Sequence, residues 1–183
     1  MNLHEFQAKE LFESYDLPVS KRGLIRKLSD VDNAIASIDF SNGCVAKVQA
    51  HTGGRGKVGG VKLCKNKEEI ENFVNSWLGK KIITNQTDEA GLPVNIVSID
   101  ELTDIDSELY MSLIVDRADK CVSMIVSKAG GMNIEEVAET NPEKILKLKF
   151  KHNVQVSEQD INELGSKLCL LYTSPSPRDL RKS

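Results

Sequence analysis

The stretch Val45-Ala-Lys-Val-Gln-Ala-His-Thr-Gly-Gly-Arg-Gly-Lys57 decides how the first half of this chain is expected to fold. It begins as a short apolar strand that carries one lysine, Lys47, and continues into a glycine-rich basic loop; residues 59–63 then resemble a returning strand. Glycine adopts positive φ and has no Cβ, so such a loop brings backbone N–H groups close together. With Arg55 and Lys57 beside them, these groups predict an anion site, most naturally for phosphate, to which Lys47 adds a point charge.

Other interpretations of this loop stay open when it is taken alone. It lacks the G-x-x-x-x-G-K-[ST] spacing of a P-loop, and no helical pattern follows it. A hairpin turn whose charges are merely solvated is the main alternative. RNA contact through the Gly-Arg-Gly segment is disfavoured, because the net charge is −3, the pI is about 5.7 and no aromatic residues interleave with the basic ones. We therefore expect a phosphate ligand and no nucleic-acid partner.

Composition is typical of a globular protein of 183 residues, enough for one domain or two small lobes. No apolar run approaches the roughly 20 residues of a membrane span, and the first residues lack the basic and apolar regions of a signal peptide. We therefore expect no membrane association and a cytoplasmic location, either the bacterial cytosol or a compartment like the mitochondrial matrix.

Cysteine and histidine spacing argues against a metal site. Cys44, Cys64, Cys121 and Cys169 form no C-x-x-C pair, so neither zinc nor a redox motif is indicated. The first three flank or lie in apolar runs, which favours buried free thiols. The histidines at positions 4, 51 and 152 are too scattered in sequence to suggest metal ligands.

Apolar periodicity predicts helices and strands that interleave along the chain, as in an α/β fold. We expect helices near residues 2–15, 29–38, 70–78, 133–138 and 157–168, and strands near 19–26, 45–48, 61–64, 95–99, 108–115, 121–127 and 145–150. Asn2 with Glu5 is expected to cap the first helix, Ser29 the second, and Ser157 with Asp160 the last.

A series of short motifs follows in order along the chain. They are Met1-Asn-Leu-His-Glu-Phe-Gln-Ala-Lys-Glu-Leu-Phe12, His51-Thr-Gly-Gly-Arg-Gly-Lys57, Gly59-Gly60-Val61, Trp77-Leu-Gly-Lys80, Gln86-Thr-Asp88, Pro93-Val-Asn95, Thr103-Asp-Ile105, Glu108-Leu-Tyr110, Val115-Asp-Arg117, Gly130-Gly131 and Ile134-Glu-Glu-Val-Ala-Glu139. Together, from residue 1 to about 168, they resemble the N-terminal part of the β subunit of ADP-forming succinate–CoA ligase (succinyl-CoA synthetase).

This resemblance implies an α/β ATP-grasp fold, here its incomplete N-terminal part, in which two small α/β subdomains bind ATP or ADP between them. Carried over by position, Lys47 contacts the ATP phosphates. The same comparison makes Gly54, Arg55 and Gly56 the loop that covers those phosphates.

The resemblance also implies contacts to the rest of the nucleotide. Asp100 and Thr103 would border the base and sugar, and Glu108 would help fix the ribose. Asp100 departs from the family pattern, in which we expect glutamate, and the adjacent Glu101 is a possible substitute. Without the resemblance, these acids would be read as the solvated edge of a strand.

The activity implied is that of a ligase forming a carbon–sulfur bond in the tricarboxylic acid cycle. It joins succinate and CoA at the expense of ATP, through a phosphohistidine on a partner α subunit. CoA and that histidine belong mainly to the α subunit, and the Mg²⁺ ligands lie further along the β chain than this sequence reaches. No catalytic or metal-binding residue is therefore expected here, and His51 is expected to be a hydrogen-bonding group of the loop. The alternatives are a malate–CoA ligase β subunit and a non-catalytic nucleotide-binding or subunit-association module.

The C-terminal residues do not fit the resemblance. The segment Cys169-Leu-Leu-Tyr-Thr-Ser-Pro-Ser-Pro-Arg-Asp179 looks like a translated sequencing adapter. We therefore expect residues 1–168 to be a partial ATP-grasp domain and residues 169–183 to be non-native, with a genuine Ser/Pro-rich disordered tail as the alternative. A fragment of this kind is expected to lack ligase activity and to expose apolar surface that missing segments would cover.

Overall fold

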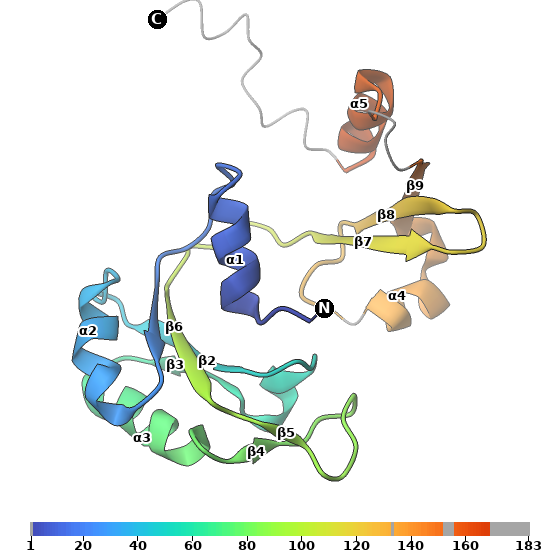
Figure 1. Cartoon of the computed structure of the whole chain (residues 1–183). Coiled ribbons are helices and arrows are strands. Elements are labelled where there is room, and N and C mark those ends of the chain that lie inside the picture. The colour runs from blue at the N-terminus through green and yellow to red at the C-terminus, as the bar shows by residue number, and fades with distance from the viewer. Residues whose placement is uncertain (1, 133, 152–155, 169–183) are drawn as a thin grey trace, which may run out of the picture. The chain divides into compact units, whose positions relative to one another are not determined.

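Two units make up the chain, and the boundary between them falls between Asp104 and Ile105 (Figure 1). No change in composition marks this boundary in the sequence. The structure, a computed structural model, describes residues 2–132, 134–151 and 156–168. The predicted non-native tail, residues 169–183, lies outside the described residues. No helix in the described part of the chain is both long and apolar enough to cross a membrane.

Unit 1, residues 1–104, is built on an antiparallel four-stranded sheet of order β1-β6-β2-β3. Its strands are β1 (Arg22–Ile25), β2 (Cys44–Gln49), β3 (Val61–Cys64) and β6 (Ile96–Glu101). The helices are α1 (Glu5–Glu13), α2 (Val31–Ala36) and α3 (Lys67–Trp77), with short 3-10 turns η1 (Leu28–Asp30) and η2 (Arg55–Val58). A separate two-stranded ribbon pairs β4 (Lys81–Ile82) with β5 (Leu92–Pro93).

One face of this sheet forms the hydrophobic core. Alternation along β2 and β6 puts apolar side chains on that face, where they pack against α2 and α3. The buried members are Val31, Ala34, Cys44, Ala46, Val48, Ile70, Phe73, Val74, Val97 and Ile99. The opposite face carries Lys47, Gln49, Ser98 and Asp100, and α1 contacts it through polar side chains. A sheet with one apolar and one polar face thus determines where the charged groups gather.

Helix α3 confirms the clearest sequence pattern. Its buried residues follow the helical period, and Asn66 caps it by accepting the Glu69 N–H at 2.9 Å. Gly79, at φ +77°, follows the helix and allows the chain to turn. Trp77, the last residue of the helix, is partly buried and packs against the core.

Two cap predictions were wrong. Helix α1 begins after His4, whose backbone N–H is satisfied by the Gln7 side chain at 2.9 Å, so Asn2 is not the cap. Helix α2 begins after Asp30, whose carboxylate accepts backbone N–H groups of residues 26 and 27, and Ser29 makes no cap bond. At α1 a side chain of the first turn thus satisfies the backbone N–H of the residue before the helix, whereas the Asp30 carboxylate binds amides that precede α2 and no side chain caps α2 itself.

Unit 2, residues 105–183, contains an antiparallel three-stranded sheet of order β7-β8-β9. Its elements are β7 (Tyr110–Asp116), β8 (Cys121–Ser127), α4 (Ile134–Thr140), η3 (Pro142–Lys144), β9 (Ile145–Phe150) and α5 (Glu158–Lys167). The three strands were predicted within two residues at each end. The Ser157 hydroxyl accepts the Asp160 N–H at 3.1 Å, which confirms the predicted cap of α5.

One face of the unit 2 sheet is entirely apolar. The cross-strand register places Met111, Leu113, Val115, Val122, Met124, Val126, Leu146, Leu148 and Phe150 on it. On the edge strand β7 these side chains stay 64%, 59% and 75% exposed. The structure therefore has the exposed apolar surface expected of an incomplete domain.

The prediction of buried free thiols is confirmed for the three described cysteines. Cys44, Cys64 and Cys121 are buried and free, and Cys44 lies directly opposite Cys64 in the β2–β3 register. Burial raises the pKa of the Cys44 thiol to about 12, so it is not a reactive thiolate at neutral pH. Cys169 lies outside the described residues.

Candidate functional site

The basic loop, residues 51–60, joins β2 to β3 as the sequence predicted. The register pairs Lys47 with Val61, and Val48 N–H donates to the Gly60 carbonyl at 2.8 Å. Between β2 and β3, the turn η2 is flanked by Gly54 at φ +70° and Gly59 at φ +79°, both in the left-handed region that favours glycine. The glycines thus fold the loop back onto the end of β2.

The loop rests on the segment that follows β4. Gly53 N–H donates to Gln86 Oε1 at 2.8 Å, and the hydroxyls of Thr52 and Thr84 lie 2.7 Å apart. A Cβ at Gly54 would lie 2.8 Å from Asn85 Oδ1, the end of a side chain that can move aside, so it is the φ of +70° that favours glycine here. These contacts hold the loop in one conformation, unlike a free hairpin turn.

The predicted loop residues Gly54, Arg55 and Gly56 share an unusual property. Their backbone N–H groups donate to no acceptor among the described residues, because the first hydrogen bond of η2 begins at Lys57 N–H. Gly56 is also exposed and faces open space, with Val61 Cγ2 as its nearest neighbour at 4.0 Å. Three free donors on one short segment are what an anion-binding loop needs.

Charged side chains gather beside this loop in what we call the charge cluster: Glu5, Lys9, Lys47, Arg55 and Asp100. Asp100 Oδ2 binds Lys47 Nζ at 2.8 Å and Lys9 Nζ at 2.5 Å. Glu5 Oε1 lies 3.2 Å from both lysines, and Glu5 Oε2 accepts Arg55 Nη2 at 2.6 Å. Three cations thus share two carboxylates, which leaves one excess positive charge.

The electrostatics keep these groups charged. Burial by itself would raise the pKa of Glu5, but Lys47, Arg55 and Lys9 lower it to about 2. Burial likewise opposes the charged form of Lys47, yet Asp100 and Glu5 raise its pKa above the ordinary value. Lys47 therefore remains a cation at neutral pH, as a phosphate ligand must.

Asp100 is placed differently from a solvated strand edge. It is 2% exposed, and its second oxygen, Oδ1, has no hydrogen-bond partner among the described residues. Its side chain faces Lys47 on the polar side of the sheet, so the structure brings it to the loop lysine. A contact of Asp100 with the base or sugar of the nucleotide stays a prediction. The idea that the partly buried Glu101 makes this contact in place of Asp100 also stays a prediction.

The two remaining predicted residues, Thr103 and Glu108, lie outside the elements that carry the charge cluster. Thr103 is exposed and follows β6 outside any strand. Glu108 belongs to unit 2, where it is exposed and its carbonyl accepts Gly130 N–H at 3.2 Å. Their proposed contacts with the ribose stay predictions.

Sequence reasoning missed the contribution of α1. Glu5 and Lys9 are four positions apart, a spacing that puts both on one face of a helix. This spacing was the sequence signal that could have predicted their pairing. Gln49 also fixes the helix, since it accepts Phe6 N–H at 3.3 Å and donates to Ser98 Oγ at 2.9 Å.

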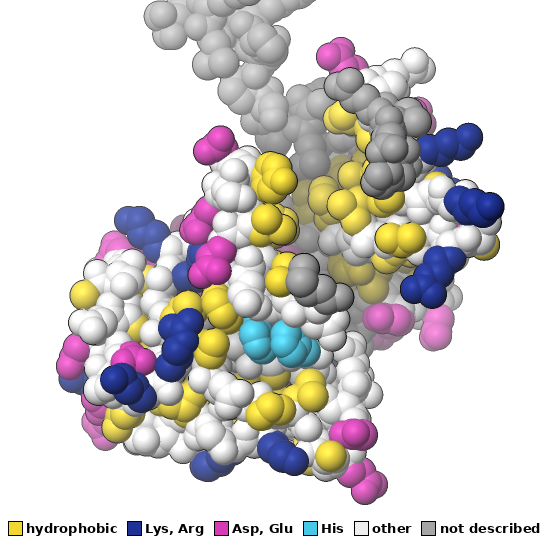
Figure 2. Space-filling model, in the orientation of Figure 1, with side chains coloured by type: hydrophobic (Ala, Val, Ile, Leu, Met, Phe, Trp, Pro, Cys, Tyr) yellow, Lys and Arg dark blue, Asp and Glu magenta, His cyan; other side chains and the backbone are white. Residues whose placement is uncertain are grey.

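Two histidines also link α1 to the loop. The rings of His4 and His51 stack with centroids 3.9 Å apart, and they appear as the cyan pair in Figure 2. A hydrogen bond from the His51 side chain, which we expected, is not found among the described residues. Desolvation, His51 and Arg55 lower the pKa of His4, which favours the neutral form of the His4 ring.

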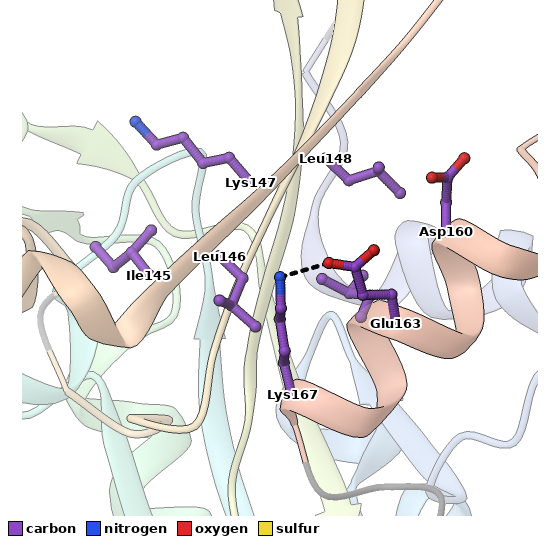
Figure 3. A pocket seen from close by; sticks show the side chains of 8 residues that line it. Ile145, Leu146, Lys147, Leu148, Asp160, Glu163 and Lys167 are labelled. Atoms are coloured by element: carbon purple, nitrogen blue, oxygen red, sulfur yellow. Dashed lines mark hydrogen bonds and ion pairs between the residues drawn. The ribbon is translucent and has the colours of Figure 1, made fainter.

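Other candidate sites are weaker. In unit 2, a hollow of about 260 Å³ lies between β9 and α5 (Figure 3). Four aliphatic and four charged residues line it, and one of the charged residues, Lys167, is paired with Glu163 at 2.7 Å. The group formed by Asp116, Asp119 and Cys121 could hold a metal ion by spacing, but Lys149 already pairs with both acids. Neither place combines free donors with charge as the basic loop does.

Comparison with known proteins finds relatives of this chain over most of its length. The ATP-grasp domain family matches residues 2–175. The β subunit of ADP-forming succinate–CoA ligase from Haemophilus influenzae (strain PittEE) is 48% identical over 150 residues, covering 82% of this chain and 38% of that protein. Its counterpart from Saccharophagus degradans is 47% identical over 170 residues, covering 93% of this chain and 44% of that protein. The chain therefore spans about two fifths of the length of these relatives.

Solved structures agree on the fold. An acetyl-coenzyme A synthetase from Ca. Korarchaeum cryptofilum superposes with a TM-score of 0.62 at 21% identity, over 91% of this chain and 65% of that one. An ATP citrate lyase from Methanothrix soehngenii superposes with a TM-score of 0.60 at 16% identity, over 94% of this chain and 44% of that one. At these identities the likeness shows the fold alone.

Proposed function

Since the chain belongs to the ATP-grasp domain family, we propose that it binds ATP as the N-terminal part of a succinate–CoA ligase β subunit. The observation that carries this proposal is the basic loop itself. Three of its N–H groups have no acceptor among the described residues, and Arg55 of the same loop is bridged to Lys47 by the Glu5 carboxylate. A site that binds one anion in this way is suited to a phosphate oxygen.

The roles of the residues follow from their chemistry. Arg55 offers a planar fork that fits phosphate, and Lys47 offers a compact charge that neutralises it. Asp100 and Lys9 position Lys47 from the polar face of the sheet. In this proposal the chain holds and orients the phosphates, while succinate and CoA bind in the complete complex with an α subunit.

Magnesium does not fit the described part of the site. Glu5 and Asp100 are the carboxylates near the loop, and both are bound to cations at 2.5–3.2 Å. Asp100 Oδ1 is the one carboxylate oxygen of this pair without a partner among the described residues, and a single buried oxygen is fewer than the several oxygen ligands that Mg²⁺ takes. Metal ligands are therefore expected in the C-terminal part that the relatives possess beyond this sequence.

Nucleotide titration of the purified chain tests the proposal. ATP binding measured by calorimetry should weaken about tenfold or more in Lys47→Ala and in Arg55→Ala, because each loses a charge-assisted contact. Lys62→Ala is the matched control, since Lys62 is an exposed lysine on the neighbouring strand β3. Equal affinity in all these variants would place the nucleotide elsewhere.

The ligase assignment needs the completed subunit. Restoring the C-terminal part and adding an α subunit should give ATP-dependent phosphorylation of the α-subunit histidine. Lys47→Ala should slow that step without changing the dependence on succinate. Succinate-specific effects of Lys47→Ala would mean that the loop binds a different ligand.

A further inference from the structure

Helix α1 inserts a carboxylate between the two cations that face the basic loop. Glu5 Oε1 lies 3.2 Å from Lys47 Nζ, and Glu5 Oε2 lies 2.6 Å from Arg55 Nη2. Its side chain is 28% exposed, so it closes the cation pair without being sealed from solvent. A carboxylate that bridges Lys47 and Arg55, with one oxygen on each, is therefore already present, and it comes from the protein.

We propose that Glu5 is an internal competitor, which occupies the Lys47–Arg55 anion site until a polyphosphate displaces it. This inference rests on the proposed function, because it assigns the phosphates to the same two cations. Helix α1 then becomes a strap whose first turn regulates access to the loop.

Competition follows from geometry and charge. A phosphate group that binds Lys47 Nζ and Arg55 Nη2 through the donors that Glu5 now uses would place its oxygens where the two Glu5 oxygens lie. Holding both anions there would place like charges a few ångströms apart, where repulsion in a partly buried site is strong. A multiply charged phosphate chain can outcompete one carboxylate, whereas a small monoanion gains little. The arrangement thus favours a polyphosphate over chloride or acetate.

Lys9 lowers the free-energy cost of displacing the Glu5 carboxylate from the Lys47–Arg55 anion site. Its Nζ lies 3.2 Å from Glu5 Oε1, one helical turn further along α1. A displaced carboxylate therefore keeps a cation partner and is not left as an unpaired, partly buried charge. The helix itself stays attached, because Lys9 binds Asp100 and Gln49 binds Phe6 N–H.

The test compares tripolyphosphate binding to variants of the 183-residue chain by isothermal titration calorimetry. Glu5→Gln removes the competing charge and should tighten binding by about tenfold, the inverse of losing one charge-assisted contact. Glu5→Asp keeps the charge on a shorter side chain, so its affinity for tripolyphosphate should lie between that of Glu5→Gln and that of the unaltered chain. Glu10→Gln is the control, since Glu10 is an exposed acid on the same helix and its removal changes the net charge equally. Circular dichroism checks that every variant is folded.

The outcomes separate this inference from the proposed function. A residue that merely holds α1 or aligns the cations would lower affinity when replaced, so weaker binding by Glu5→Gln overturns the inference. Affinity equal to that of Glu10→Gln overturns it too, while a loss in Lys47→Ala would still uphold the phosphate site. Should Glu5→Gln not fold, Glu5→Asp decides by the same comparison. Absence of binding in every variant refutes both the inference and the anion site.

Discussion

Replacing Lys47 should destabilise unit 1 as well as weaken nucleotide binding, because Lys47 is one of two cations on a buried carboxylate. Asp100 has a side chain that is 3% exposed, and its Oδ2 is shared by Lys47 at 2.8 Å and Lys9 at 2.5 Å. Its Oδ1 has no hydrogen-bond partner in the described chain, so the two lysines make the direct contacts that stabilise the buried charge.

The magnitude follows from these contacts. Breaking a buried ion pair completely costs about 3–5 kcal/mol, but Lys9 remains in Lys47→Ala. Loss of the charge-assisted hydrogen bond between Lys47 and Asp100 costs about 1.5–3 kcal/mol, and the longer contact of Lys47 with Glu5 is lost with it, so the free energy of unfolding should decrease by about 1.5–3 kcal/mol or more. In an Asp100→Asn background the same substitution should cost less, by at least about 1 kcal/mol, because the charge that Lys47 serves is gone.

Urea unfolding followed by circular dichroism measures this double-mutant cycle. The slope with denaturant should stay constant among the four proteins, so that midpoints report stability alone. A cost for Lys47→Ala below about 0.5 kcal/mol, within the range of ordinary surface substitutions, would refute the reasoning. An equal cost in both backgrounds would also refute it, since Lys47 would then stabilise unit 1 through some other group.

Further predictions concern the loop, the pH dependence and the apolar sheet face. Arg55→Lys should recover only part of the ATP affinity lost in Arg55→Ala, because the planar fork is absent; full recovery in calorimetry would contradict this. The pKa of Glu5 is about 2 against an ordinary 4.5, so its stabilising contribution is fully present above pH 4.5 and is lost as the pH falls toward 2; acid titration of Glu5→Gln should show a smaller loss over that window. The pKa of His4 is lowered from 6.5, so the folded state binds fewer protons and stability declines as the pH falls below 6.5; His4→Phe should flatten that decline in melting experiments. Leu113→Lys should reduce binding of a hydrophobic dye, because Leu113 is 59% exposed on the apolar face, whereas Ile83→Lys, at a 54% exposed position in unit 1, should change it less.

Local patterns in the sequence predicted what local physics determines. The β2–loop–β3 hairpin follows from a short apolar run and closely spaced glycines, and α3 follows from its 3.6-residue period. The nearness of Lys47 to Arg55 is a property of that hairpin, so it too could be predicted. The strands of unit 2 were found for the same reason.

The contacts that complete the site are not local. Glu5 reaches Lys47 across 42 positions, and Lys9 reaches Asp100 across 91. The apolar residues Phe12 of α1 and Tyr15 just after it are 47% and 73% exposed. The helix instead turns its polar side to a polar sheet face, and only the tertiary arrangement of the strands reveals that choice.

The link between Trp77 and the basic loop has a spectroscopic consequence. The indole Nε1–H donates to the carbonyl of Gly59 at 3.2 Å, where the loop returns to β3. Trp77 is also the single tryptophan of the chain. Its emission therefore reports on one end of the loop with no background from other indoles, so a ligand that shifts the loop should change the fluorescence spectrum of the unlabelled protein.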